Sequence, residues 1–196
     1  GLRFHIPVLA DYRELEPVIL RALRKLAAKG IELDQIGPVK VDFKKVTVYA
    51  TEGGRIAVGI EANADVIRSP LKGTNGVIWL SAIAYNKDNS EVVQVRDLRI
   101  AGTTDREAVN LLFALFEDPE VLAEISKALV TDFNKDYEKV LVAAKNAIAL
   151  RREGDFTLSA EVNEVSHGTV IATGQGLFLP VDVTGKANIR YTPQPR

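Results

Sequence analysis

The chain contains two histidines, His5 and His167, and only the second has acidic residues shortly before it in the sequence. Glu161 and Glu164 precede His167 at spacings that could bring three metal ligands together, because imidazole and carboxylate groups both bind divalent cations. Gly168 directly after this histidine indicates a turn, however, and polar residues in turns are ordinarily solvated. We therefore expect an exposed turn at His167 rather than a metal site.

Serine hydroxyl groups could act as nucleophiles only beside an activating base. A histidine must take the serine proton and a carboxylate must orient the histidine, and in many hydrolases the serine stands in a glycine-flanked turn between a strand and a helix. The serines considered for this role lack that context: Ser81, Ser90, Ser126 and Ser159. We expect no serine hydrolase chemistry.

Three carboxylates, on Asp132, Asp136 and Glu138, fall within one predicted helix. Paired carboxylates can act as general acid and base when a cleft holds them together. Lys135 and Lys139 interleave with them at the spacing that pairs opposite charges on a helix surface. This pattern is typical of a solvated helix face, and we expect that the protein is not an enzyme.

The segment Gly174-Gln-Gly176 has the glycine spacing of some phosphate-binding loops. Such a loop leads from a strand into the N-terminus of a helix, where free N–H groups hold the phosphate. Here the residues that follow alternate as a strand does. We expect a glycine-kinked bend in a curved sheet, and neither a nucleotide nor any other cofactor.

Composition restricts the remaining classes of function. The chain has 25 basic and 26 acidic residues and a formal net charge of −1, whereas a nucleic-acid-binding domain usually has a basic excess. The absence of cysteine excludes disulfides and thiolate metal sites. No apolar stretch approaches the roughly 20 residues of a membrane-spanning helix. Because methionine is also absent, we expect the chain to be an excised part of a longer protein.

Apolar periodicity predicts the elements of the first half, because alternation indicates strands and spacings of three and four indicate helices. The expected elements are a strand over 2–8, a helix from Asp11 to about Lys29 before Gly30, strands over 38–50 and 56–64 joined by a turn at Gly53-Gly54, a loop over 70–76, and strands over 77–85 and 92–100. In the strand over 38–50 the apolar residues change parity at Lys44-Lys45, which predicts a β-bulge.

The second half begins with helical signals. Thr104 and Glu107 have the spacing of a capping box, and a short helix that includes Leu111 and Phe116 follows. After a second helical segment, three strands close the chain, over about 155–165, 168–174 and 176–191.

The second helical segment determines the expected architecture. Asp118 is a favourable N-cap, Pro119 suits the first helical position, and apolar spacing continues to about Glu153. One helix over 119–153 would be about 50 Å long, and the longest strands, of about 12 residues, would reach about 40 Å. Such lengths predict an elongated α+β fold, in which a long, curved, mainly antiparallel sheet wraps around a long helix. We expect residues 1–196 to form a single domain of this kind.

Four short segments carry a resemblance to a known family. They are Ile6-Pro-Val-x-x-Asp11-Tyr-x-x-Leu15, Val46-Thr-Val-Tyr49 with the turn Gly53-Gly54, Val95-x-Asp97-Leu98, and Ala172-Thr-Gly174-Gln-Gly176 with Gly185-Lys-Ala187. With the order strand, helix, long meander, helices and hairpins, they resemble tubular lipid-binding (TULIP) domains, and in particular a bacterial TULIP-like family described only as a domain of unknown function. The resemblance implies the C-terminal half of an exported protein in the periplasm or cell envelope.

The resemblance also implies a ligand, which would be a lipid or another hydrophobic small molecule, and peripheral contact with a membrane. The large apolar residues most able to line a groove or tunnel between sheet and helix are Trp79, Phe113, Phe116, Leu129, Phe133, Tyr137 and Phe178. The alternative is that these side chains fill the core of a structural or protein-interaction domain of the envelope that has no ligand. An apolar cavity along the long helix distinguishes the two hypotheses.

Overall fold

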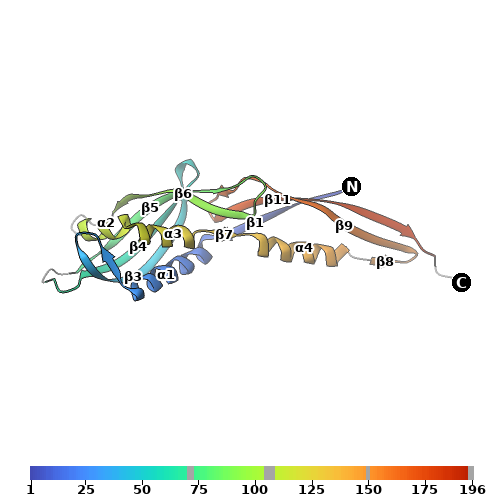
Figure 1. The fold of residues 1–196 in the computed structure, drawn as a ribbon. Helices are drawn as coiled ribbons and strands as arrows, with labels where there is room; N and C mark the ends of the chain where they lie inside the picture. The colour runs from blue at the N-terminus through green and yellow to red at the C-terminus, as the bar shows by residue number, and fades with distance from the viewer. Residues whose placement is uncertain (70–72, 104–108, 149–150, 194–196) are drawn as a thin grey trace.

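Alternating apolar residues form two antiparallel sheets, which lie end to end and give the molecule an elongated shape (Figure 1). The structure is a computed structural model that describes residues 1–69, 73–103, 109–148 and 151–193. Buried apolar side chains from both sheets belong to one continuous cluster. The expected α+β class with long antiparallel strands is therefore confirmed.

Among the described residues, the larger sheet has six strands. In spatial order they are β2 (Ile31–Leu33), β3 (Gly37–Thr51), β4 (Arg55–Val66), β5 (Thr74–Asn86), β6 (Val92–Thr103) and β7 (Thr131–Asp132). All neighbouring pairs are antiparallel. The turn predicted between β3 and β4 is a 3-10 turn, η1 (Glu52–Gly54), in which Gly53 and Gly54 both have a φ of 70°. Glycine adopts this left-handed conformation at little cost, unlike other residues.

The predicted β-bulge in β3 is present. The pairing of β3 with β4 changes register between Phe43 and Lys45, which leaves Lys44 as the extra residue. Phe43 before the bulge and Val46 after it are both buried. The bulge thus keeps the apolar side chains on one face although their parity in the sequence changes.

The smaller sheet joins the two ends of the chain. Its strands are, in spatial order, β1 (Leu2–Asp11), β11 (Gly176–Tyr191), β9 (Phe156–His167) and β8 (Arg151–Glu153), and β10 (Ile171–Ala172) pairs with the start of β11. The pairing of β1 with β11 runs without interruption from Leu2 opposite Gly185 to Asp11 opposite Gly176.

A pair of prolines protects the edge of this sheet. Pro7 on β1 lies directly opposite Pro180 on β11, and neither residue has an N–H to donate. The carbonyl of Pro180 accepts a hydrogen bond of 2.8 Å from the amide of Gly168, on the side away from β1. The missing N–H of Pro7 therefore faces the outer edge of β1, where it disfavours pairing with another strand.

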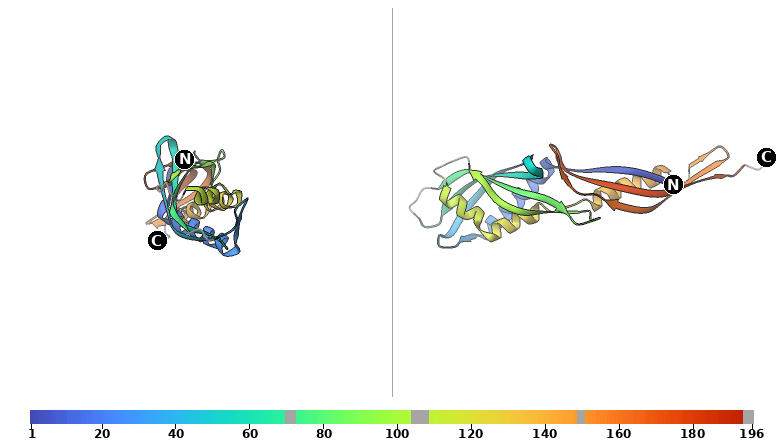
Figure 2. Two further views of the ribbon diagram at one scale, coloured as in Figure 1. Left: turned by 90° about the vertical axis from the view of Figure 1, so that its left-hand side faces the viewer. Right: turned by 90° about the horizontal axis from the view of Figure 1, so that it is seen from above.

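In the part of the chain that the structure describes, one face of the larger sheet is covered by the helices α1 (Tyr12–Lys29), α2 (Val109–Glu117) and α3 (Pro119–Ala128). Figure 2 shows them within the curve of the sheet. Helix α1 begins as predicted, because the Asp11 side chain accepts a hydrogen bond of 2.9 Å from the Arg13 amide. Its buried side chains Ile19 and Leu23 lie on the side that packs against β3. The helix ends before Gly30, which has a φ of 94°.

The predicted continuous helix over 119–153 is wrong. Helix α3 ends at Ala128, the short strand β7 follows, and a new helix, α4 (Asn134–Ile148), precedes strand β8. At the break the backbone pairs with β6, and the amide of Phe133 donates a hydrogen bond of 3.2 Å to the carbonyl of Glu91. Helix α3 packs against β6 of the larger sheet, whereas α4 packs against β9 and β1 of the smaller sheet.

Two β-branched residues explain where the helix is interrupted. Val130 and Thr131 favour extended backbone, and the edge of β6 provides hydrogen-bond partners for that backbone. The apolar spacing continues across the break, so periodicity alone did not reveal it. The elongated shape comes from two sheets placed end to end (Figure 1), and not from one sheet wrapped around one long helix.

Smaller differences concern element boundaries. Strand β5 begins at Thr74, inside the predicted loop over 70–76, and the strand predicted over 168–174 is reduced to β10. The capping box predicted at Thr104 and Glu107 lies outside the described residues.

Candidate functional site

The paired strands β9 and β11 carry apolar side chains on one face along their whole length. Residues directly opposite each other in an antiparallel pair project from the same face. We call the end of this sheet that lies away from the larger sheet its free end (Figure 1). Toward the free end, β9 and β11 form five such pairs: Val165–Val183, Val162–Gly185, Ala160–Ala187, Leu158–Ile189 and Phe156–Tyr191. We call these ten residues the apolar strip.

A second β-bulge makes the strip continuous. The register of β9 against β11 shifts between Thr184 and Gly185, and Asn163 has no partner on β11. The apolar residues of β9 are even-numbered up to Val162 and odd-numbered from Val165. Without the extra residue, the two halves of β9 would present their apolar side chains on opposite faces.

Behind the apolar strip, the opposite face of the smaller sheet is mostly polar. Glu164 lies opposite Thr184, and Glu161 lies opposite Lys186. On β1, Nδ1 of His5 lies 3.0 Å from a carboxylate oxygen of Asp182. The sheet is therefore amphipathic, and its apolar face is the one that must be covered by other groups.

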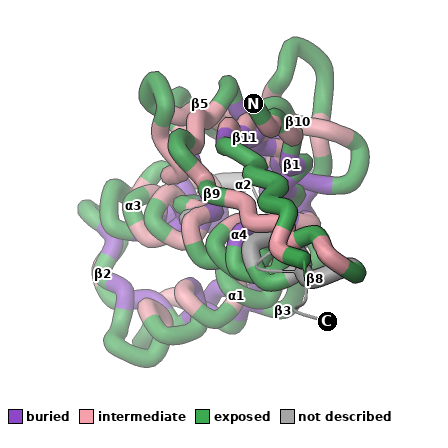
Figure 3. Tube along the Cα trace, turned by 90° about the vertical axis from the view of Figure 1, so that its right-hand side faces the viewer, coloured by how far each residue is buried: buried purple, intermediate pink, exposed green. Residues whose placement is uncertain are grey.

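The burial of the strip changes from one end to the other, and the tube in Figure 3 shows that β11 passes from buried to exposed along its length. Val183 is fully buried, whereas the exposed fractions of Phe156, Tyr191 and Ile189 are 49%, 62% and 69%. Large apolar side chains exposed together mark binding surfaces more often than isolated ones do. The free end of the strip is thus a candidate binding surface.

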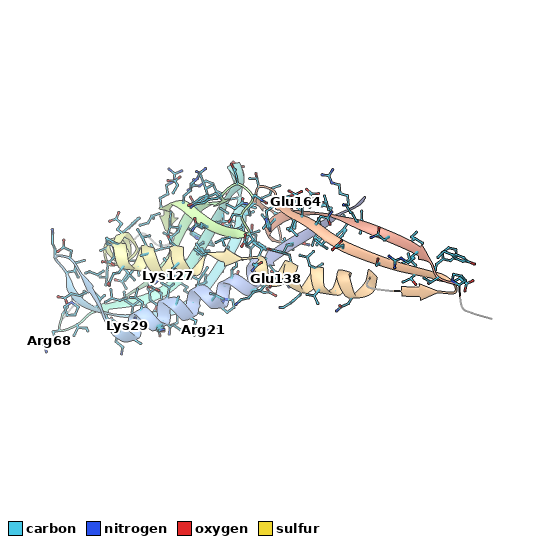
Figure 4. All side chains as sticks on the ribbon, turned by 45° about the vertical axis from the view of Figure 1, so that its right-hand side comes forward. Arg21, Lys29, Arg68, Lys127, Glu138 and Glu164 are labelled. Carbon is cyan, nitrogen blue, oxygen red and sulfur yellow. The ribbon has the colours of Figure 1, made fainter. Side chains whose placement is uncertain are left out.

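Helix α4 covers part of the same face. It packs against β9 and β1, and its Leu141 is buried. The ring of Tyr137 lies 5.1 Å from the ring of His167 between centroids. Figure 4 shows α4 running alongside β9 and β11. Val140 and Val142 on this helix are 45% and 55% exposed, so apolar surface is available on the helix as well as on the strip.

One side of α4 also carries an open depression of about 560 Å³. It is lined by Lys135, Glu138, Lys139, Val142, Ala143 and Asn146, which recur at helical spacing. Lys135, Glu138 and Lys139 are exposed. Their placement agrees with the solvated helix face that the sequence predicts for these charges.

The seven residues predicted to line a groove do not share one surface. Phe116, Leu129 and Phe133 are fully buried, whereas Trp79, Phe113, Tyr137 and Phe178 are half-buried on β5, α2, α4 and β11. We call the face of the smaller sheet that carries the apolar strip its inner face. Of these seven residues, Tyr137 contacts the inner face, because its ring packs against the ring of His167. The ring of Phe116 packs edge-on against Phe43, with 6.2 Å between centroids, and so contributes to a filled core.

Trp79 and Phe178 lie on outer faces. Phe178 pairs with Leu9 and alternates with the buried Leu177 and Leu179. Trp79 alternates in the same way with Ile78 and Leu80, which are buried, and it lines a separate pocket. The structure therefore does not bring all seven residues together in one tunnel between sheet and helix.

His167, Glu161 and Glu164, which were considered as metal ligands, lie on two different faces of β9, because successive side chains of a strand point to opposite faces. His167 lies opposite Val181, on the inner face, while Glu161 and Glu164 are exposed on the outer face. Nδ1 of His167 lies 3.2 Å from the side-chain oxygen of Asn89. Within the described ranges, no group of three or more His, Cys, Asp or Glu side chains is placed to hold a metal ion.

The glycines at 174 and 176 form a turn between two strands, as predicted. The Thr173 amide donates a hydrogen bond of 2.9 Å to the carbonyl of Gly176, and β11 follows directly. A Cβ atom at Gly176 would lie 2.0 Å from the carbonyl oxygen of Ala10, so glycine allows β1 and β11 to approach. No helix follows, and the turn lacks the geometry of a phosphate-binding loop.

Sequence reasoning missed the residues at the free end of the strip. Phe156, Leu158, Ile189 and Tyr191 are too few and too spaced to stand out as an apolar run. The signal that could have found them is the matched alternation over 156–162 and 185–191, which puts both sets on one face if the two strands pair. None of the helices in the described part of the chain is long and apolar enough to cross a membrane.

Comparisons with known proteins identify a family and a likeness to a solved structure. Residues 1–191 match a family model described as "Domain of unknown function (DUF4403)". No curated protein matches the chain. The chain is similar to a solved structure described as "Crystal structure of lipopolysaccharide binding protein", with a TM-score of 0.40 and 11% identity. That match covers 97% of this chain and 51% of the other, so the chain spans about half the length of that protein.

Proposed function

The chain belongs to the DUF4403 family of domains of unknown function, and we propose that it binds an acyl chain or a similar apolar ligand on the apolar strip. The observation that carries this proposal is the change in burial along one continuous apolar face, from Val183, which is fully buried, to Ile189, which is 69% exposed. A ligand that lies along the strip extends the apolar core of the smaller sheet to its free end.

The strip is large enough for a lipid tail. From Val183 to Tyr191 it spans roughly 26 Å, at the usual rise per strand residue. Burial of one methylene group contributes about 0.8 kcal/mol, so ten contribute about 8 kcal/mol before the costs of ordering. Micromolar binding corresponds to about 8 kcal/mol. Because ordering the ligand costs part of this free energy, an acyl chain somewhat longer than ten methylenes is needed to reach it.

The proposal places the ligand on the smaller sheet and not between the larger sheet and its helices. Phe116, Leu129 and Phe133 are fully buried, which favours a filled core in that half of the molecule. The finer parts of the proposal are a TULIP-like architecture, a location in the bacterial envelope and a function without catalysis. Their support is the resemblance of the sequence motifs.

Uptake of a fluorescent fatty acid by the delipidated chain tests the proposal. Ile189→Asp places a charge on the strip, and Asn188→Asp places the same charge on the opposite face of the same strand. We expect saturable micromolar binding by the unchanged chain, a loss of about tenfold or more in Ile189→Asp, because burying a carboxylate against an acyl chain is unfavourable, and little change in Asn188→Asp.

Two results contradict the proposal. One is the absence of saturable uptake by the unchanged chain. The other is equal affinity in the two variants, which would move the ligand away from the strip. Circular dichroism of both variants controls for folding, and we expect both to fold because both side chains are exposed.

A further inference from the structure

A second pocket lies on the outer face of the larger sheet, and it has a different chemical character. Its volume is about 530 Å³, and its lining consists of Tyr49, Thr51, Glu52, Arg55, Ala57, Trp79, Ser81, Arg99, Ile100 and Ala101. Trp79 and Ser81 alternate along β5 with Ile78 and Leu80, which are buried on the other face. The pocket is therefore separated from the helices by the sheet itself.

Two aromatic rings form one wall of this pocket. Trp79 lies directly opposite Gly59, and a Cβ atom at Gly59 would lie only 2.4 Å from the tryptophan ring. The ring therefore rests on the glycine backbone and is held close to the sheet. Tyr49 packs edge-on against it, with 5.5 Å between centroids, and is 44% exposed.

A fixed guanidinium group forms part of the floor. Nε of Arg55 donates a hydrogen bond of 2.9 Å to Oγ of Ser81, and its two terminal nitrogens donate to the carboxylate and the carbonyl of Asp97 at 2.7 and 2.9 Å. The hydrogen bond from Arg55 holds the pKa of Asp97 below its usual range, so the carboxylate is charged at neutral pH. These bonds use three of the five N–H groups of a guanidinium and leave two that can donate to a ligand.

Charges of both signs surround this floor. Nε of Arg99 lies 4.0 Å from the Asp97 carboxylate, while its side chain is 64% exposed. Glu52 adds a carboxylate to the lining. The positive charges of Arg55 and Arg99 are thus offset by two carboxylates, that of Glu52 in the lining and that of Asp97, which pairs with both arginines. A simple anion gains little from such a site, and an apolar ligand would leave the guanidinium N–H groups without partners.

The backbone around the pocket is irregular. The register of β5 against β6 shifts twice, between Trp79 and Leu80 and between Ser81 and Ile83. Asp97 has a φ of 53°, which is costly for a residue other than glycine. β-Bulges and such conformations concentrate next to binding sites, where they direct side chains.

We propose that this pocket binds a saccharide ring. The apolar C–H face of the sugar stacks on Trp79 and Tyr49, and its hydroxyl groups exchange hydrogen bonds with Arg55, Arg99 and Glu52. A saccharide matches the pocket because it combines an apolar face with neutral donors and acceptors along its edge. This site is independent of the apolar strip, which lies on the other sheet.

Binding can be measured by the intrinsic fluorescence of Trp79, because it is the only tryptophan in the chain. The purified chain is titrated with glucose, N-acetylglucosamine, glucuronic acid and, separately, inorganic phosphate at millimolar concentrations, and the intrinsic fluorescence is recorded. We expect a saturable change with at least one of the three sugars and none with phosphate. Arg99→Ala should weaken the sugar response about tenfold, as expected for the loss of a charged hydrogen-bond donor.

The matched control is Arg96→Ala, on the same strand. The guanidinium of Arg96 lies 5.1 Å from the centre of the Tyr85 ring, and neither residue lines the pocket. This variant should respond as the unchanged chain does. Any of three results overturns the proposal: no saturable change with any of the three sugars, the same affinity in Arg99→Ala as in the unchanged chain, or an equal change with phosphate.

Discussion

The ring of Phe156 lies 5.4 Å from the ring of Tyr191, measured between centroids, in the last pair of the apolar strip. Phe156 begins β9 and Tyr191 ends β11, so this contact joins the free ends of the two strands. Both side chains are about half exposed or more. An aromatic pair in this position contributes less to the core than to the surface on which a ligand can lie.

Phe156→Ala should separate the two roles of this pair. We expect a loss of stability of about 1 kcal/mol, because the ring is half exposed and an aromatic contact contributes about that much. The affinity for a fluorescent fatty acid should fall measurably in the same variant. Unfolding by denaturant and a binding titration measure the two effects. A stability loss of the size seen for a buried phenylalanine would show that the pair belongs to the core.

Phe133→Ala provides the contrasting case. Phe133 is fully buried at the junction between β7 and α4, so truncation leaves a cavity and should cost about 3–5 kcal/mol. A loss of about 1 kcal/mol would instead indicate a partly empty wall, as expected for a tunnel between helix and sheet. The measurement is the free energy of unfolding in denaturant, with Phe156→Ala as the reference.

Local patterns in the sequence were sufficient for most of the fold. Alternation, the Asp11 cap, the turn at Gly53 and the bulge at Lys44 depend on neighbours in the chain, and all four are confirmed. The break at Val130 depends on a distant partner, because β6 must offer its edge before residues 131–132 can pair. The spacing of apolar residues within one segment contains no information about a partner that is distant in the sequence.

The candidate site was harder to predict for the same reason. Tyr191 and Phe156 share a face only because β11 pairs with β9 in one particular register, which Asn163 adjusts by one residue. Large apolar residues such as Phe133 stood out in the sequence, yet they are buried. Residue size indicates the core, whereas a surface site depends on pairing.

Gly176→Ala should test the close approach of β1 and β11. The new Cβ atom would lie 2.0 Å from the carbonyl oxygen of Ala10, so the strands must move, at a cost of about 2–3 kcal/mol. Gly174, in the same turn, has no heavy atom within 4 Å of an added Cβ. Gly174→Ala should therefore change stability by less than about 0.5 kcal/mol. Thermal unfolding of both variants checks the difference, and similar melting temperatures would contradict it.

The Tyr12 hydroxyl should make stability depend on pH in alkaline solution. It donates a hydrogen bond of 2.9 Å to the carbonyl of Thr173, and burial raises the pKa of Tyr12 to about 12. The pKa in the unfolded chain is about 10. Because the folded state holds the proton more tightly, this contribution is complete below pH 10 and is lost as the pH rises toward 12.

Tyr12→Phe removes this dependence. At pH 11 the shift corresponds to a loss of about 1.4 kcal/mol relative to neutral pH. Between pH 9 and pH 11 the free energy of unfolding of the unchanged chain should therefore fall by about 1.3 kcal/mol more than that of Tyr12→Phe. Denaturant titrations at the two pH values measure it, and parallel losses in both proteins would argue against a buried, protonated Tyr12.

Photo-crosslinking tests the central claim, that an apolar ligand lies on the apolar strip, most directly. The delipidated chain is mixed with a fatty acid that carries a diazirine on its acyl chain, irradiated, digested and examined by mass spectrometry. We predict adducts within residues 156–162 and 185–191 and on the exposed valines of α4, all suppressed by an excess of unlabelled fatty acid. The claim would be contradicted if an excess of unlabelled fatty acid did not suppress the adducts, or if the adducts were confined to the larger sheet and its helices.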